Sequence, residues 1–372
     1  MQTLHSSQSQ VGLHSEVPLE TYQAVLEHLI SAEQADVRRV GKVTRKIKLI
    51  EQKYKEEVRD LMGANKYKQL RAYVAEVKQA QAERLLPPRG PDMSVEELAG
   101  LHAQRREASQ KFLNKLGVSA IDLAKLTKSY RRQLERLVPP PPTLKGKPVQ
   151  LVLPADVPPA IRAKKTNPWT RVTPPYAGWA WNYNGWVAGF GFTPTLYLDS
   201  AAGLVGNSND LTDSDASDLD VGSVEYNANV GFWYRMPSTG LVEVWIEGQS
   251  AASHHHLSLY DEFGWSDSSV YQRNYLTLQT SDGVADEQKV SQMSWFWRTG
   301  YSDGNWDNHY LSDGATYWAH LFSGVSYPSG SWVYIQVGTR TLNNCLANDI
   351  EVYSTIHFRW FIRSIWVEST GG

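Results

Sequence analysis

The sequence predicts a multidomain α + β protein with an N-terminal helical bundle or hairpin, a proline-rich linker and a C-terminal antiparallel β-sandwich or jelly roll. Three observations predict it. Apolar residues recur at helical spacing within residues 1–138, proline is dense over residues 139–175, and short alternating runs of aromatic and β-branched residues fill residues 176–372. All 14 tryptophans occur from Trp169 onward, which favours two differently built parts.

Charge divides the chain in a similar way. Residues 1–150 hold 26 Lys and Arg against 17 Asp and Glu, whereas residues 151–372 hold 11 against 22. The only cysteine is Cys345, so an intrachain disulfide is excluded. We expect no secretory signal and no membrane-spanning helix, because no basic stretch precedes an apolar core and no apolar run approaches about 20 residues. The compartment stays open, either cytoplasmic assembly or a non-standard export route.

Four helices are expected in the first 138 residues. The first runs from Pro18 to about Met62, the second begins near Asn65, the third spans 94–116, and the fourth begins at Ser119. Within the first helix, apolar residues alternate at spacings of three and four, which is the pattern of a short coiled-coil seam. The pattern fits packing within one chain as well as pairing between chains. The seam residues are Val40, Val43, Ile47, Ile50 and Tyr54.

The basic residues of this first helix surround its apolar face without interleaved aromatic residues or a known reader motif. This favours a solvated helical face, or attraction to the acidic C-terminal half, over nucleic-acid binding. Nucleic acid is therefore not an expected partner.

Residues 139–175 are expected to form an extended, semi-rigid spacer because of their prolines. Beyond them, the period-two runs predict short strands joined by turns, and Ser-Asp-Gly triplets are expected to form three of those turns. The expected strands are 195–199, 230–236, 241–247, 275–280, 293–300, 316–322, 331–338 and 350–368, and the triplets are 281–283, 302–304 and 312–314.

Several tryptophans lie in turn-rich sequence. Exposed rings on loops would offer flat apolar faces, suited to stacking on sugar rings or to anchoring protein interfaces. The alternative is that these rings cap the ends of the sandwich. The residues concerned are Trp179, Trp181, Trp186, Trp265 and Trp306.

The stretch LVEVWIE, taken as a strand, places Glu243, Trp245 and Glu247 on one face. A carboxylate pair beside an aromatic ring suits glycan contact or glycoside hydrolysis, although the two glutamates would have Cα atoms about 13 Å apart. The stretch resembles the Glu-x-Asp-x-Glu strand of laminarinase-type glucanases, and this resemblance implies a concanavalin-like sandwich. Trp245 stands in place of the middle acid of that family. A solvated strand face is the alternative.

The histidines that follow resemble the first metal motif of the cupins, which are jelly rolls. The matching positions are Gly248, His254, His256 and Asp261, with Asp where the family has Glu. The second motif is incomplete, because Val333 stands where a histidine ligand is needed. Two imidazoles need further ligands to hold a metal, and a histidine-rich loop or strand end is the alternative. The unplaced candidate ligands are His309, His320 and His357.

An acidic stretch at 210–220 carries carboxylates at nearly alternate positions, which suits calcium, but it lacks the spacing of an EF-hand. A solvated acidic loop is the alternative. The candidate calcium ligands are Asp213, Asp215, Asp218 and Asp220, and no other cofactor is expected.

These patterns predict a structural, adhesive protein that self-associates into an oligomer, filament or shell, with the sandwich contacting neighbours or glycans. The incomplete motifs at the glutamates and histidines do not predict an enzyme. The alternatives are a carbohydrate-binding module on a helical stalk and, behind it, a sandwich-fold glycosidase or a cupin-like metalloenzyme.

Overall fold

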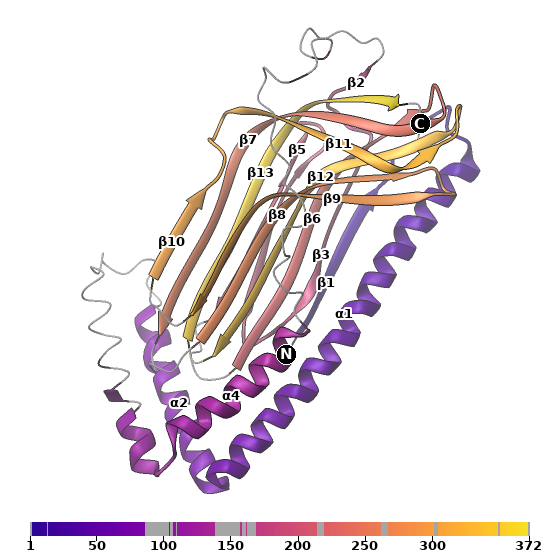
Figure 1. Ribbon diagram of the computed structural model, residues 1–372. Coiled ribbons are helices and arrows are strands. Elements are labelled where there is room, and N and C mark those ends of the chain that lie inside the picture. The colour runs from indigo at the N-terminus through magenta and orange to yellow at the C-terminus, as the bar shows by residue number, and fades with distance from the viewer. Residues whose placement is uncertain are drawn as a thin grey trace.

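The computed structural model describes residues 2–12, 14–85, 104, 107–108, 110–137, 157, 161, 169–213, 219–261, 267–300, 304–348 and 350–370. A long N-terminal helix is followed by two antiparallel sheets in a sandwich-like arrangement (Figure 1). The prediction of an α + β chain with an antiparallel sandwich is thereby confirmed, while the jelly roll stays a prediction.

Each sheet is built from strands that are mostly distant in sequence. Sheet A has the order β1 (Gln2–Gln10), β3 (Gly178–Ala188), β6 (Leu219–Arg235), β12 (Trp332–Asn348), β8 (Asp267–Ser281) and β9 (Asp286–Gly300). Sheet B has the order β10 (Gly304–His309), β7 (Gly240–Asp261), β13 (Ile350–Thr370), β5 (Leu204–Asp213) and β4 (Gly191–Asp199). In addition, β11 (Thr316–Tyr327) pairs with β7, and β2 (Thr170–Val172) pairs with β13.

All eight expected strands coincide with observed strands, although 230–236 and 331–338 each extend one residue beyond β6 and β12. Five further strands were not predicted, namely β1, β2, β3, β5 and β10. The first of these lies in a region where only helices were expected, and its residues 2–10 pair with 179–187 at the edge of sheet A. Strands β3, β5 and β10 are rich in Gly, Asn and Asp, which are depleted in strands, and cross-strand pairing overrides that weak preference.

The space between the sheets holds two apolar clusters. The larger one surrounds Ile246 and Trp360, and the smaller one surrounds Leu257, Val270 and Val352. Trp360 is fully buried and lies directly over Gly248, where an added Cβ would stand 1.9 Å from the indole ring. A glycine at 248 is therefore required by packing.

Between the two clusters lies a set of fully buried polar side chains, which we call the inter-sheet polar belt. Several of its members bond to one another across the sandwich, while Asn209 Oδ1 and Asn274 Oδ1 have no partner among the described residues. Asn343 Nδ2 donates to the carbonyl oxygens of Asn209 and Ser354, both at 2.8 Å, and Gln272 Nε2 donates to Ser354 Oγ at 2.8 Å. The belt consists of Asn207, Asn209, His255, Gln272, Asn274, Thr341, Asn343 and Ser354, each with no exposed surface.

The helices are α1 (Leu19–Met62), α2 (Ala64–Leu85) and α4 (Ala120–Glu135), and residues 110–116 are also helical. Gly63, with φ of +80°, separates α1 from α2. The predicted cap of α4 is confirmed, because Ser119 Oγ accepts a hydrogen bond from the backbone N–H of Asp122 at 3.3 Å. Most of the expected helix 94–116 lies outside the described residues.

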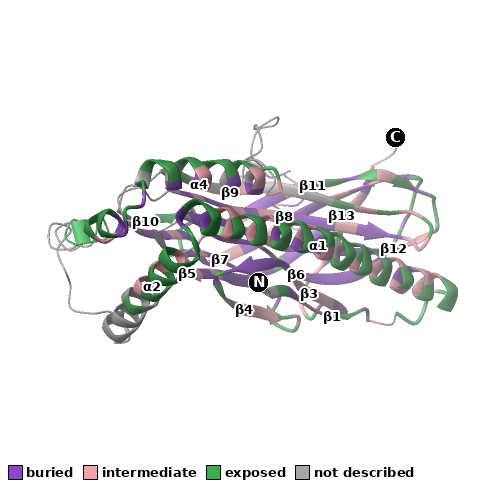
Figure 2. Ribbon diagram, turned by 90° about the horizontal axis from the view of Figure 1, so that it is seen from below, coloured by how far each residue is buried: buried purple, intermediate pink, exposed green. Residues whose placement is uncertain are grey.

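Helix α1 runs along the outer face of sheet A (Figure 1), with its own outer side exposed (Figure 2). Two apolar contacts, which we call the anchors of α1, hold it there. In the first anchor, Val25 packs with Trp233 and Tyr334. In the second, Val40 and Ile47 pack with apolar residues of sheet A and α4, namely Trp186, Ala188, Val221, Leu346, Tyr130 and Leu134.

The predicted helical seam is therefore used within its own chain. Val40 and Ile47 are buried, while Val43, Ile50 and Tyr54 are partly buried against the same cluster. The helical part and the sandwich share this cluster, so residues 1–138 are joined to the sandwich by packing as well as by the linker.

Most of the expected spacer, 139–175, lies outside the described residues, and the spacer stays a prediction. Within it, Val157 and Ile161 are buried against tryptophans of sheet B. Among the helices that the structure describes, none has both the length and the apolar character needed to cross a bilayer.

Candidate binding site

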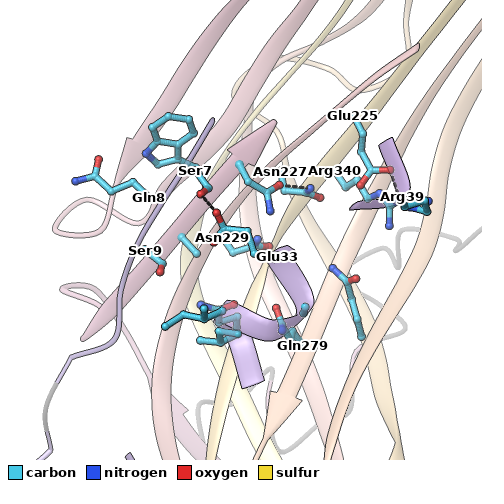
Figure 3. A pocket seen from close by; sticks show the side chains of 18 residues that line it. Ser7, Gln8, Ser9, Glu33, Arg39, Glu225, Asn227, Asn229, Gln279 and Arg340 are labelled. Carbon is cyan, nitrogen blue, oxygen red and sulfur yellow. Dashed lines mark hydrogen bonds and ion pairs between the residues drawn. The ribbon is translucent and has the colours of Figure 1, made fainter. Parts of the chain in front are cut away.

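A polar groove lies between the two anchors, where α1 passes over the outer face of sheet A (Figure 3). Its volume is about 470 Å³. Strand β1 and the middle of sheet A supply most of its lining, and the first half of α1 supplies the rest. The lining residues are Ser7, Gln8, Ser9, Leu29, Ile30, Ala32, Glu33, Arg39, Ala180, Trp181, Asn182, Glu225, Asn227, Asn229, Gln279, Gln288, Gln336 and Arg340.

The alternation of β6 creates the centre of the groove floor. Val224, Tyr226, Ala228 and Val230 are buried in the sandwich, so the residues between them point to the other face of sheet A. Those residues are Glu225, Asn227 and Asn229, which all line the groove. Strand β6 therefore has one apolar face that closes the sandwich and one amide-rich face that forms the floor of the groove.

A glycine allows one of these amides to lie flat across the sheet. Asn229 and Gly338 are cross-strand partners, and a Cβ added at Gly338 would stand 2.5 Å from Asn229 Oδ1. The Asn229 side chain lies across Gly338 of β12. Its Oδ1 accepts a hydrogen bond at 2.5 Å from Thr277 Oγ1 of β8. The amide is therefore fixed in orientation before any ligand arrives.

The charged residues of the groove are engaged by neighbours (Figure 3). Arg340 forms an ion pair with Glu225, and Glu33 accepts hydrogen bonds from Ser7 and from the His5 ring, the latter at 3.2 Å. Together with Arg39, the lining holds two acidic and two basic side chains, so the groove carries no net charge when all four are ionised.

Three buried polar atoms of the lining side chains have no hydrogen-bond partner among the described residues. They are Asn227 Oδ1, Gln336 Nε2 and Arg340 Nε. The other end of the Asn227 amide is satisfied, because its Nδ2 donates to Asn182 Oδ1 at 2.6 Å. A buried polar group without a partner costs about 1–3 kcal/mol, and these three atoms, each with less than 1 Å² of accessible surface, add to the polar character of the floor.

None of the amides in the groove was singled out by the sequence analysis. Their period-two spacing in β6 is a visible signal, but it is equally typical of a solvated strand face. Only the position of α1 over that face turns it into a groove, and this contact joins segments almost 200 residues apart.

The chain shows no match to any protein-family model and none to a curated protein. Among solved structures, it is similar to TmCBM61, determined in complex with β-1,4-galactotriose, at 9% identity over 43% of this chain and 86% of the other, with a TM-score of 0.13. A loop-swap mutant of Necallimastix patriciarum Xyn11A matches at 8% identity over 50% and 95% of the two chains, with a TM-score of 0.16. At such TM-scores these likenesses establish neither fold nor function.

The tryptophans that were expected on loops lie on strands instead. Trp179 and Trp181 are half-buried on β3, where Trp179 Nε1 donates to Gln10 Oε1 at 3.0 Å, and Trp181 borders the groove. Trp186 is 4% exposed beneath α1, and Trp306 on β10 packs against the smaller apolar cluster. Trp265 lies outside the described residues. Of the four that the structure describes, Trp181 alone lines the groove.

The face of Glu243, Trp245 and Glu247 is the outer face of sheet B. Trp245 is buried under Val157 and Ile161, and its ring stacks on His320 with centroids 4.1 Å apart. The glutamates have separate partners: Glu243 accepts from the His320 ring at 2.7 Å, and Glu247 accepts from Ser364 Oγ at 2.6 Å. The strand face is confirmed, while a glycan contact there stays a prediction.

The run HHH lies inside β7, so its histidines point to alternate faces. His255 is fully buried in the polar belt, between Gln272 Oε1 at 3.0 Å and Ser294 Oγ at 2.8 Å. His254 lies on the outer face of sheet B in one row with His309 and His357, its ring centroid 5.3 Å and 5.0 Å from theirs. No group of three or more His, Cys, Asp or Glu in the described part of the chain is arranged to hold a metal ion.

Burial controls the ionisation of these rings. It lowers the pKa of His255 and of His357, each to about 4, and the neighbouring His254 lowers the pKa of His357 further. Desolvation also lowers the pKa of His254.

The acidic stretch at 210–220 begins in one strand and ends in another. Asp213 ends β5, while Asp220 belongs to β6, is buried, and lies against Gly189. Asp215 and Asp218 lie outside the described residues, so a calcium site there stays a prediction.

Proposed function

We propose that this protein binds uncharged carbohydrate in the groove between α1 and sheet A. The observation that carries the proposal is the set of side-chain amides on the groove floor, on Asn182, Asn227, Asn229, Gln279 and Gln336. They include both acceptor and donor positions, and a sugar hydroxyl can serve either, because it both donates and accepts.

The chemistry of the lining supports a sugar more than other small ligands. Side-chain amides dominate the floor, and an amide offers two donors and one acceptor oxygen that match the hydroxyl groups of a sugar ring. Pockets for drug-like or cofactor ligands are mostly apolar, unlike this one. The two acidic and two basic side chains of the lining, with Glu225 paired to Arg340, favour a ligand without net charge.

We further propose that the role is binding and not catalysis. A glycosidase needs two carboxyl groups that flank the scissile bond, free to act as acid and base or nucleophile. In the groove, Glu225 is held by Arg340 and Glu33 by Ser7 and His5. Both carboxylates serve to position neighbouring groups.

The proposal is tested by measuring the binding of neutral oligosaccharides by glycan array and then by calorimetry. The double variant Asn227→Ala/Gln336→Ala removes hydrogen bonds from the floor and should weaken binding about tenfold or more. Asn308→Ala is the matched control, because Asn308 is an exposed amide on β10 of the other sheet. Retention of full affinity in the double variant, or no glycan binding by the native protein, would contradict the proposal.

Self-association remains a second proposed property. The opposite charges of the helical and sandwich halves favour head-to-tail contacts between copies. The coiled-coil seam does not supply those contacts, because Val40 and Ile47 are buried within the chain.

A further inference from the structure

The lining of the groove comes from every strand of sheet A. Ser7 of β1, Asn182 of β3 and Asn227 of β6 are consecutive cross-strand partners. On the other side, Gln336 of β12, Gln279 of β8 and Gln288 of β9 are consecutive partners in the same way. All six residues line the groove, in two rows of three that are offset by four residues along the strands, because Asn227 is opposite Arg340 and Gln336 is opposite Gly231.

The strand order sets the length of the groove. Six strands β1-β3-β6-β12-β8-β9 leave five intervals, and at about 4.8 Å each they span about 24 Å across the sheet. The four-residue offset between the two rows adds about 13 Å along the strands, so the line from Ser7 to Gln288 is about 27 Å long. A single sugar ring would touch only two or three of these strands. The regular repeat of similar hydrogen-bonding groups matches a ligand that is itself a repeat.

Helix α1 forms the roof of the groove. It is anchored at Val25 on one side and at Val40 and Ile47 on the other, while Ala32 and Glu33 between the anchors line the groove. The two ends lie at the edge strands of sheet A and reach solvent, since Ser9 on β1 and Gln288 on β9 are both exposed. The site is therefore roofed by α1, whose Glu33 contacts Ser7 of β1, while the outermost lining residues, Ser9 and Gln288, are exposed.

From this geometry we infer that the ligand is a linear, unbranched chain of neutral sugars that threads beneath α1 across the whole of sheet A. The inference rests on the proposed function and adds the ligand's shape. A branch on the chain would meet the helix above or the sheet below. The affinity should grow with chain length until the chain reaches from β1 to β9.

The test is a calorimetric titration of the native protein with linear neutral oligosaccharides, from disaccharide to hexasaccharide, beside branched isomers of equal size. We expect the pentasaccharide to bind about tenfold or more tightly than the disaccharide, and a branched isomer to bind about tenfold or more weakly than the linear one. Ser9 and Gln288 lie at opposite ends of the groove, so Ser9→Ala and Gln288→Ala should each lower the affinity for the pentasaccharide by about threefold. The affinity for a disaccharide should fall in at most one of these two variants.

The outcomes separate the two proposals. Binding that is independent of chain length, or equal for branched and linear isomers, would overturn the threading and leave carbohydrate binding in place. A native protein that binds none of the series would overturn both. Asn308→Ala is again the control, and the thermal unfolding of each variant checks that a loss of affinity is not a loss of fold.

Discussion

Arg340 of β12 and Glu225 of β6 form an ion pair on the floor of the groove, with only 20% and 12% of their side chains exposed. The Arg340 guanidinium also lies 5.8 Å from the centre of the Tyr275 ring. The pair joins two central strands of sheet A diagonally, since Arg340 is directly opposite Asn227 and not Glu225. It lies beneath α1, where water screens charge poorly.

Removing one member of this pair should destabilise the protein. Glu225→Gln leaves the Arg340 charge buried without its partner, and we expect a loss of about 3 kcal/mol in the free energy of unfolding, measured by urea titration. Replacing both residues, as Glu225→Gln/Arg340→Met, should cost clearly less than the two single substitutions together. Additive losses would show that the two charges do not interact.

Acid should destabilise the protein through His255. Its pKa is about 4 in the folded chain against 6.5 for a free imidazole, so the unfolded chain binds more protons between these values. Stability is therefore complete above about pH 6.5 and falls as the pH drops toward 4, by about 3 kcal/mol in total. Urea unfolding at pH 7.5 and pH 4.5 measures the loss. In His255→Gln the pH dependence should be smaller, and an unchanged dependence would contradict this assignment.

The second anchor of α1 should depend on Ile47. This side chain is 1% exposed, so Ile47→Ala leaves a cavity between α1 and sheet A and should cost about 2–4 kcal/mol. Leu49, two residues away on the same helix, is 67% exposed and provides the control. Leu49→Ala should change the free energy of unfolding by less than about 0.5 kcal/mol. Equal losses in the two variants would mean that α1 does not rest on the sheet at Ile47.

Self-association is tested by the absolute mass in solution, measured by light scattering at low and at high salt. If opposite charges on the two halves join the copies, the mass should exceed that of one chain at low salt and fall as salt screens those charges. A single-chain mass at both salt concentrations would contradict self-association and would leave the proposal of carbohydrate binding unaffected.

The sequence was sufficient for elements whose pattern is local. Helix α1 has apolar residues at helical spacing from Val40 to Tyr54, and α4 begins at a serine that caps it. The strand β3 was missed because tryptophan, asparagine and glycine mix in it without a clean alternation, and it is paired on both sides. Pairing partners far along the chain decided its structure.

The site was missed for the same reason. Asn227 and Asn229 alternate with buried residues exactly as a solvated face would, and nothing near them in sequence indicates that α1 will cover them. Conversely, Trp245 was expected to be a contact surface because of its flanking glutamates, but Val157 and Ile161 of the linker bury it. Which polar and which aromatic surfaces are covered depends on long-range packing.

The inter-sheet polar belt also bears on how the sheets are aligned. Strands of 17 to 22 residues, such as β6, β7, β12 and β13, can slip by two residues without moving any side chain to the wrong face. Such a slip would carry Gln272 about 6.6 Å from Ser354 and from the carbonyl of His256, to which it now donates at 2.8 Å and 2.9 Å. Several amides would then be buried without partners. The belt thus selects one alignment among misfolded alternatives that an all-apolar core would tolerate, so apolar replacement of Gln272 should favour misaligned chains even where it spares stability.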